Sequence, residues 1–150
     1  MSLVRAVWKI SDSLRYTVLF AEDSYATGVR AVVERFAAEG IEPVSLKNYW
    51  GGDGYQGIND VFGIPSSVSL TGVLKVEVQF HTSESFAHKT AAHMQYEEFR
   101  SAMDPNRKMV LYEEMVEAAK RVPMPTGVLG LQPFKKHVMP VKRMVRCLEK

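Results

Sequence analysis

The chain has 150 residues, the size of a single domain, and its 46% hydrophobic and 24% charged residues are ordinary for a globular protein, which excludes a disordered or low-complexity chain. A single cysteine, Cys147, excludes an internal disulfide and the zinc motifs that need several cysteines. The net charge of +2 is uneven, because six basic residues against Glu149 give residues 135–150 a charge of +5 and leave −3 on residues 1–134. A nucleic-acid-binding protein needs a continuous basic face, so that class ranks last.

Membrane and secretion signals are missing from the sequence. No apolar run approaches the length of a membrane span, and the first ten residues lack the apolar core of a signal peptide. We therefore expect no membrane association and a cytoplasmic protein, or one that is delivered into a target cell's cytoplasm without a cleaved signal.

The first predicted elements are a strand and a helix. Residues 15–20 are β-branched and aromatic, which predicts a strand. Residues 24–39 place apolar side chains on one helical face. Asp23 or Ser24 can cap the start of this helix, and Gly40 can end it in the left-handed conformation.

Three more strands are expected. Residues 41–50 and 57–64 flank a glycine-rich loop, and glycines allow backbone conformations that other residues avoid. In residues 74–81 apolar and polar side chains alternate, so that Lys75, Glu77, Gln79 and His81 share one face. This polar face predicts either a half-solvated sheet surface or a cleft in which a carboxylate binds Mg²⁺ or accepts a proton.

Two helices follow the last strand. Thr82 or Ser83 can cap a helix that runs to about residue 100, and Asp104 with Pro105 begins another that runs to about residue 121. On a single helix the five-residue spacing of His88 and His93 puts the two rings about 140° apart, so they are not expected to bind one metal ion together.

The order of these elements predicts the fold class. A strand–helix–strand unit, a meander and then helices indicate an α+β fold, with a mixed, mostly antiparallel sheet of four to five strands covered by helices. We assign residues 1–121 to this core and residues 122–150 to a basic C-terminal tail of the same domain.

Five short motifs follow one another along the chain, and the best-defined lie at residues 54–59 (GYQGIN), 77–82 (EVQFHT) and 91–96 (AAHMQY). These three resemble the motifs Gly-Tyr-Arg-Ser-Leu-His, Glu-x-Gln-Ile-Arg-Thr and Ala-Ala-His-Trp-Lys-Tyr in the synthetase domain of the RelA/SpoT alarmone enzymes. Residues 47–49 (KNY) and 12–15 (DSLR) fall where the family has Lys-Asp-Tyr and a longer Asp-x-x-Gly-Ile-Arg. The match is closest to the small versions found in bacterial and phage toxins, which implies an immunity or carrier protein as a further partner.

The resemblance implies a reaction and a set of roles. The family transfers the β,γ-pyrophosphate of ATP to the 3′-hydroxyl of a purine nucleotide. Glu77 would bind Mg²⁺ and take the hydroxyl proton, and Asp12 would be the second metal-binding carboxylate. Tyr55 would stack on the acceptor base. Asn59 and Gln79 would position the acceptor, and His81 would also belong to the nucleotide-binding set. Arg15, as a third catalytic residue, would neutralise phosphates or orient the site, together with Lys47 and His93.

Departures from the family pattern leave an alternative open. Only 11 residues precede Asp12, so we expect most of the family's ATP-binding part to be missing. Asn59 replaces a histidine and His81 an arginine. The chain is therefore predicted to be either a nucleotide pyrophosphotransferase or a catalytically inactive nucleotide- or partner-binding module of the same fold.

Overall fold

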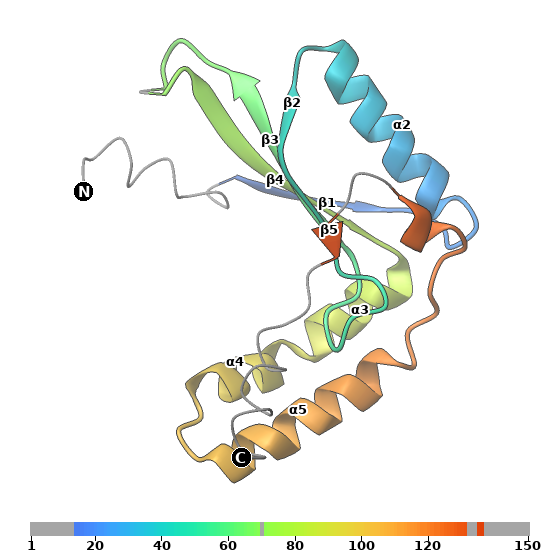
Figure 1. Cartoon of the computed structure of the whole chain (residues 1–150), viewed down its shortest axis with the longest axis vertical. Helices are drawn as coiled ribbons and strands as arrows, with labels where there is room; N and C mark the ends of the chain where they lie inside the picture. The colour runs from blue at the N-terminus through green and yellow to red at the C-terminus, as the bar shows by residue number, and fades with distance from the viewer. Residues whose placement is uncertain (1–13, 70, 132–134, 137–150) are drawn as a thin grey trace.

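The computed structural model describes residues 14–69, 71–131 and 135–136, and within these it contains one mixed five-stranded sheet (Figure 1). The strand order is β1-β4-β3-β2-β5. The strands are β1 (Arg15–Leu19), β2 (Glu42–Asn48), β3 (Ile58–Pro65), β4 (Val73–His81) and β5 (Lys135–Lys136). The three central strands pair antiparallel, and β1 and β5 add in parallel at the two sides. The predicted α+β fold with a mixed sheet is confirmed.

The described helices fall into two groups. They are α2 (Tyr25–Ala38), α3 (Ser83–Ala91), α4 (His93–Ser101), α5 (Pro105–Ala119) and a short 3₁₀ helix, η1 (Val128–Gly130). In Figure 1, α2 lies against the strands in the upper part of the view, and α3, α4 and α5 gather in the lower part. None of the helices in the described ranges is both long and apolar enough to cross a membrane.

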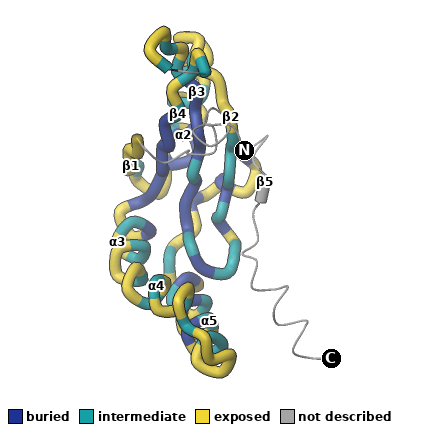
Figure 2. Tube along the Cα trace, turned by 90° about the vertical axis from the view of Figure 1, so that its left-hand side faces the viewer, coloured by how far each residue is buried: buried dark blue, intermediate teal, exposed yellow. Residues whose placement is uncertain are grey.

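The hydrophobic core lies between α2 and one face of the sheet. Val76, Val78 and Phe80 of β4 point into it, as their alternation with polar residues predicts. From α2, Tyr25 and Val29 pack against these strands and are fully buried. Figure 2 shows that burial is concentrated along β3 and β4, two neighbouring inner strands of the sheet. The polar face of β4 therefore lies on the opposite side of the sheet.

A glycine ends α2 as predicted. Gly40 has a φ of +74°, and its N–H donates to Ala37 O over 3.0 Å. The next residue, Ile41, donates to Phe36 O over 2.9 Å. These two bonds form the Schellman motif and satisfy carbonyls that the last helical turn would leave unpaired.

The single helix predicted over residues 83–100 is wrong, because the chain breaks it into α3 and α4 at Ala92. The start is as predicted: the Thr82 hydroxyl accepts from Ser85 N over 3.1 Å, and Ser85 Oγ accepts in return from Thr82 N over 3.0 Å. This reciprocal capping box fixes where α3 begins. His93 is the first residue of the second helix.

Part of the C-terminal segment belongs to the core. Val128 and Leu131 are each only 1% exposed, and the Asn48 amide donates to Val128 O over 2.9 Å. The backbone of β5 then pairs in parallel with β2. No strand was predicted here, because a two-residue strand has no alternation to detect. Cys147 and the basic residues beyond 136 lie outside the described residues.

Candidate functional site

Side chains from four strands form a polar row on the sheet face opposite the core. The register aligns Thr17 of β1 with Gln79 of β4, Gln79 with Asn59 of β3, and Asn59 with Lys47 of β2. Two residues before Thr17 on β1, and therefore on the same face, Arg15 lies opposite Glu77. Because paired residues point to the same face of a sheet, the register collects predicted site residues that are far apart in the sequence.

A chain of polar contacts links this row to α3. Arg15 Nε lies 2.9 Å from Glu77 Oε1. Gln79 Nε2 donates to the same oxygen over 2.6 Å, and Gln79 Oε1 accepts from Lys89 Nζ. Glu77 is 9% exposed and Gln79 is 4% exposed. The polar face is therefore buried beneath Arg15 and Lys89, so its interpretation as a half-solvated surface is wrong here.

Above these residues lies a cavity of about 440 Å³. Its walls come from β1, the loop between β2 and β3, the three helices α3, α4 and α5, and β3. The lining residues are Arg15, Tyr49, Tyr55, Asn59, His88, Lys89, Ala92, His93, Tyr96 and Met115. The cavity thus combines aromatic rings with basic side chains, the combination that suits a nucleobase and its phosphates.

Tyr55 is held in place on several sides. Its ring meets Tyr49 edge-on with ring centroids 5.3 Å apart. Its hydroxyl donates to Asn59 Oδ1 over 2.5 Å and lies 2.7 Å from His81 Nε2. His81 is fully buried, so it lies behind Tyr55 and does not line the cavity.

The glycine-rich loop that carries Tyr55 is braced by one side chain. Gln56 is 5% exposed, and its Oε1 accepts from Gly51 N over 3.2 Å. Its Nε2 donates to the carbonyls of Gly52 and Gly54, over 3.1 and 3.3 Å. The Gln56 side chain therefore joins the backbones of three glycines in the loop, which have no side chains of their own to hold it.

Burial dominates the electrostatics of the site. It lowers the pKa of His81 to about 4, and the positive charge of Lys89 acts in the same direction. The pKa of Lys89 is lowered, first by burial and then by Arg15, while Glu77 opposes the shift. Burial also lowers the pKa of His88. With a pKa of about 4, His81 is neutral at pH 7.

A metal site is only partly represented in the described chain. Within residues 14–69, 71–131 and 135–136, no cluster of three or more His, Cys, Asp or Glu side chains is arranged to hold an ion. Glu77 is a carboxylate beside the cavity, and Mg²⁺ in nucleotide sites is often held by one or two carboxylates together with phosphates and water. Glu77 fits as one such ligand. Asp12, the second predicted ligand, lies outside the described residues.

One buried carboxyl group lies on the other side of the sheet. Asp60 is fully buried, and its Oδ1 accepts from Lys47 N over 3.1 Å. Its Oδ2 has no hydrogen-bond partner among the described residues. Burial raises the pKa of Asp60 to about 7, and the bond from Lys47 only partly offsets this.

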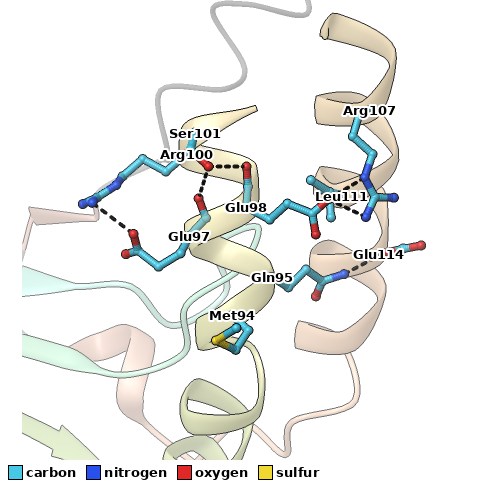
Figure 3. Close-up of a pocket in the computed structure, with 9 residues that line it drawn as sticks. All are labelled: Met94, Gln95, Glu97, Glu98, Arg100, Ser101, Arg107, Leu111 and Glu114. Carbon is cyan, nitrogen blue, oxygen red and sulfur yellow. Dashed lines mark hydrogen bonds and ion pairs between the residues drawn. The ribbon is translucent and has the colours of Figure 1, made fainter. Parts of the chain in front are cut away.

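A second cavity, of about 580 Å³, lies between α4 and α5. Figure 3 shows its charged and polar side chains pairing with one another: Arg107 with Glu98, Arg100 with Glu97, and Gln95 with Glu114. No residue predicted to carry function lines it. We therefore place the candidate site in the first cavity.

Sequence reasoning found part of this site and missed the rest. Arg15, Tyr55, Asn59 and His93 line the cavity, and Glu77 and Gln79 contact its lining residues Arg15 and Lys89. The lining residues that were missed are Tyr49, His88, Lys89, Ala92, Tyr96 and Met115. Lys89 lies four residues after Ser85, so the two side chains share one face of α3. Because Ser85 belongs to the capping box that starts this helix, the face that carries Lys89 could have been identified from the sequence. His88 and His93 both line the cavity, one on each side of the helix break at Ala92.

Comparison with known proteins gives a match at the level of fold. No family model matches the sequence, and no curated protein matches it. Small alarmone synthetase 2 from Bacillus subtilis superposes with a TM-score of 0.55 at 19% identity, covering 80% of this chain and 69% of that one. A GTP pyrophosphokinase family protein from Streptococcus pneumoniae gives 0.55 at 15% identity, over 80% of this chain and 60% of that one.

Small alarmone synthetase 1 from Bacillus subtilis, bound to its product pppGpp, gives a TM-score of 0.54 at 20% identity. The match covers 78% of this chain and 61% of that one, so the chain spans less than two thirds of this relative. At these identities the similarity establishes a shared fold, and the predicted resemblance to alarmone synthetases is confirmed to that extent.

Proposed function

We propose that this domain binds a purine nucleotide in the cavity above Glu77 and transfers the β,γ-pyrophosphate of ATP to its 3′-hydroxyl. One observation carries the proposal: a single cavity contains aromatic rings and basic side chains, and the buried carboxylate of Glu77 pairs with Arg15, one of its lining residues. The fold shared with a small alarmone synthetase whose structure holds pppGpp supports the same assignment.

The acceptor base would lie against Tyr55. Its ring lines the cavity and is supported edge-on by Tyr49. Stacking on an aromatic ring stabilises a bound base by about 1–3 kcal/mol. Asn59 lines the same wall and is proposed to contact the acceptor.

The phosphates would lie toward the basic side chains. Arg15, Lys89 and His93 line the cavity. Phosphoryl transfer depends mainly on positioning and on cations that offset the charge developing on the transferred group. Lys47 is half-buried on the same sheet face, next to Asn59 in register, and is proposed to contribute a further positive charge.

Glu77 is the proposed general base. It would accept the proton from the 3′-hydroxyl while that oxygen forms a bond to the β-phosphorus of ATP and the bond from this phosphorus to the α,β-bridging oxygen breaks, so that AMP leaves. A Mg²⁺ ion carried in by the nucleotide would neutralise phosphate charge, with Glu77 and Asp12 as its proposed protein ligands. Gln79 fixes the Glu77 carboxylate by donating to Oε1 over 2.6 Å.

A second candidate is a nucleotide-binding domain without transferase activity. It is favoured by one observation, namely that Glu77 Oε1 already accepts from both Arg15 and Gln79. A carboxylate held in this way can serve as a fixed structural anion under a phosphate-binding cavity. The two candidates share the binding site and differ in the chemistry.

A transfer assay separates the two candidates. The protein is incubated with Mg²⁺, radiolabelled ATP and each purine nucleotide as acceptor, and the products are resolved by chromatography. A pyrophosphorylated product that disappears in Glu77→Gln and persists in the exposed control Glu34→Gln would support the enzyme. If no acceptor gives a product but GDP or ADP binds in calorimetry, the second candidate holds. If neither nucleotide binds, both fail.

A further inference from the structure

The hydroxyl of Tyr55 is the centre of a hydrogen-bonded chain that runs from the cavity into the sheet. It bonds to Asn59 Oδ1 over 2.5 Å and lies 2.7 Å from His81 Nε2. The other ring nitrogen, His81 Nδ1, lies 2.9 Å from Ser85 Oγ. Tyr55 and Asn59 face the cavity, whereas His81 and Ser85 are fully buried.

The chemistry of the partners determines which atom donates in each of these hydrogen bonds. An amide oxygen can only accept, so the Tyr55 hydroxyl donates to Asn59. The phenolic oxygen then accepts from His81 Nε2–H. The neutral ring has one proton, which leaves Nδ1 as an acceptor for the Ser85 hydroxyl at 2.9 Å, a shorter contact than the 3.3 Å from Ser85 Oγ to Thr82 O. Every donor in this chain has an acceptor, as buried polar groups require.

The backbone is shaped to leave room for the His81 ring. A Cβ added at Gly57 would lie 2.8 Å from His81 Cε1, closer than side-chain atoms approach. The ring also meets Tyr55 edge-on, with centroids 5.2 Å apart. Gly57, Asn59 and His81 stand where the alarmone synthetase pattern has serine, histidine and arginine, so three departures from that pattern meet around one tyrosine.

We propose that His81 is a positioning residue, which holds the Tyr55 hydroxyl from behind so that the Tyr55 ring is presented to the nucleobase. This inference rests on the proposed function, because it assigns the base to Tyr55. Both hydrogen bonds of the hydroxyl are used inside the protein. Tyr55 therefore contacts the base through its ring, and His81 contributes to binding without touching the nucleotide.

Calorimetry with GDP and ADP tests the binding half of the proposal. His81→Phe and Tyr55→Phe each keep a ring and remove one partner of the same bond, so each should weaken the binding of the preferred nucleotide by about tenfold, the equivalent of one hydrogen bond. The double variant should bind no more weakly than Tyr55→Phe, because Tyr55→Phe already removes the hydroxyl and with it the bond to His81. His81→Gln, which keeps an N–H donor, should restore most of the affinity.

A purely structural role for His81 gives a different result. The variants would then unfold at lower temperature while the folded protein bound nucleotide as tightly as before, and the proposal would be overturned. Additive losses in the double variant would also overturn it.

Nitrogen NMR of the histidine rings tests the positioning half without any nucleotide. In the wild-type protein His81 should keep its proton on Nε2 between pH 5 and 8, and Tyr55→Phe should shift the Nε2 resonance. An unchanged Nε2 resonance in Tyr55→Phe would overturn the inference. If the wild-type protein binds neither GDP nor ADP, the proposed function fails, and the NMR result still decides whether His81 positions Tyr55.

Discussion

The ammonium group of Lys89 donates to Gln79 Oε1, although the two residues belong to different elements, α3 and β4. Because a lysine can only donate, this bond fixes the orientation of the Gln79 amide. The amide nitrogen is thereby directed to Glu77 Oε1, 2.6 Å away. One cation on a helix thus orders two buried side chains on a strand.

If the proposed function holds, Lys89→Met should lower the rate of pyrophosphate transfer at least about tenfold, because it removes a fixed donor and a positive charge from the proposed phosphate site. The methionine keeps most of the apolar stem, so the packing around position 89 should change little. Steady-state kinetics measure the effect, with Lys120→Met on the exposed end of α5 as the control. Equal rates in the two variants would contradict a role for Lys89.

Arg15→Met should separate activity from stability. The Arg15 side chain is 48% exposed and its ion pair with Glu77 is therefore screened by solvent, so the free energy of unfolding should fall by less than about 1 kcal/mol. Transfer activity should fall much further, since the variant removes a cation that lines the cavity. Urea unfolding and the transfer assay on the same preparation compare the two. A large loss of stability with unchanged specific activity would assign Arg15 to the fold alone.

Asp60 should make the protein less stable as the pH rises from about 4 to about 7. Burial raises the pKa of the folded carboxyl from 3.8 to about 7, so the folded state holds a proton that the unfolded state releases in this range. The stabilising effect is complete below the unfolded pKa and is lost through the folded pKa. Urea unfolding at several pH values should show this slope, and Asp60→Asn should flatten it. Parallel pH profiles for the two proteins would refute the assignment.

Gly40→Ala should lower the free energy of unfolding by about 1 kcal/mol. The space around position 40 is open, so the cost comes from the positive φ of 74° and not from a clash. Gly130→Ala is the matched control, because its surroundings are equally open and its φ is not in the left-handed range. Thermal unfolding of the two variants measures the difference. Equal melting temperatures would show that the helix end tolerates alanine.

Local patterns predicted the elements that local interactions build. The alternation of Val76 and Val78 with Glu77 and Gln79 identified both faces of β4, and Asp104 before Pro105 identified the start of α5. The resemblance then placed Glu77, Gln79 and Tyr55 near one another. These features depend on side chains that are neighbours in sequence or on motifs that span a few residues.

Features that depend on distant contacts were not predictable in the same way. Alternation shows that β4 has a polar face, but not that Lys89 of α3 lies above it. Neither glycine nor proline lies at the break at Ala92, so the break could not be predicted from the local sequence. The burial of Val128 depends on packing against the sheet from the far end of the chain.

The bracing of the glycine-rich loop by Gln56 has a consequence for affinity. Fixing the backbone of one residue costs roughly 1–2 kcal/mol of conformational entropy. Three hydrogen bonds from the Gln56 side chain order the loop while the protein folds, before any ligand arrives. A base stacked on Tyr55, as proposed above, would therefore meet a loop that is already ordered, and little of its contact energy would be used to organise the chain.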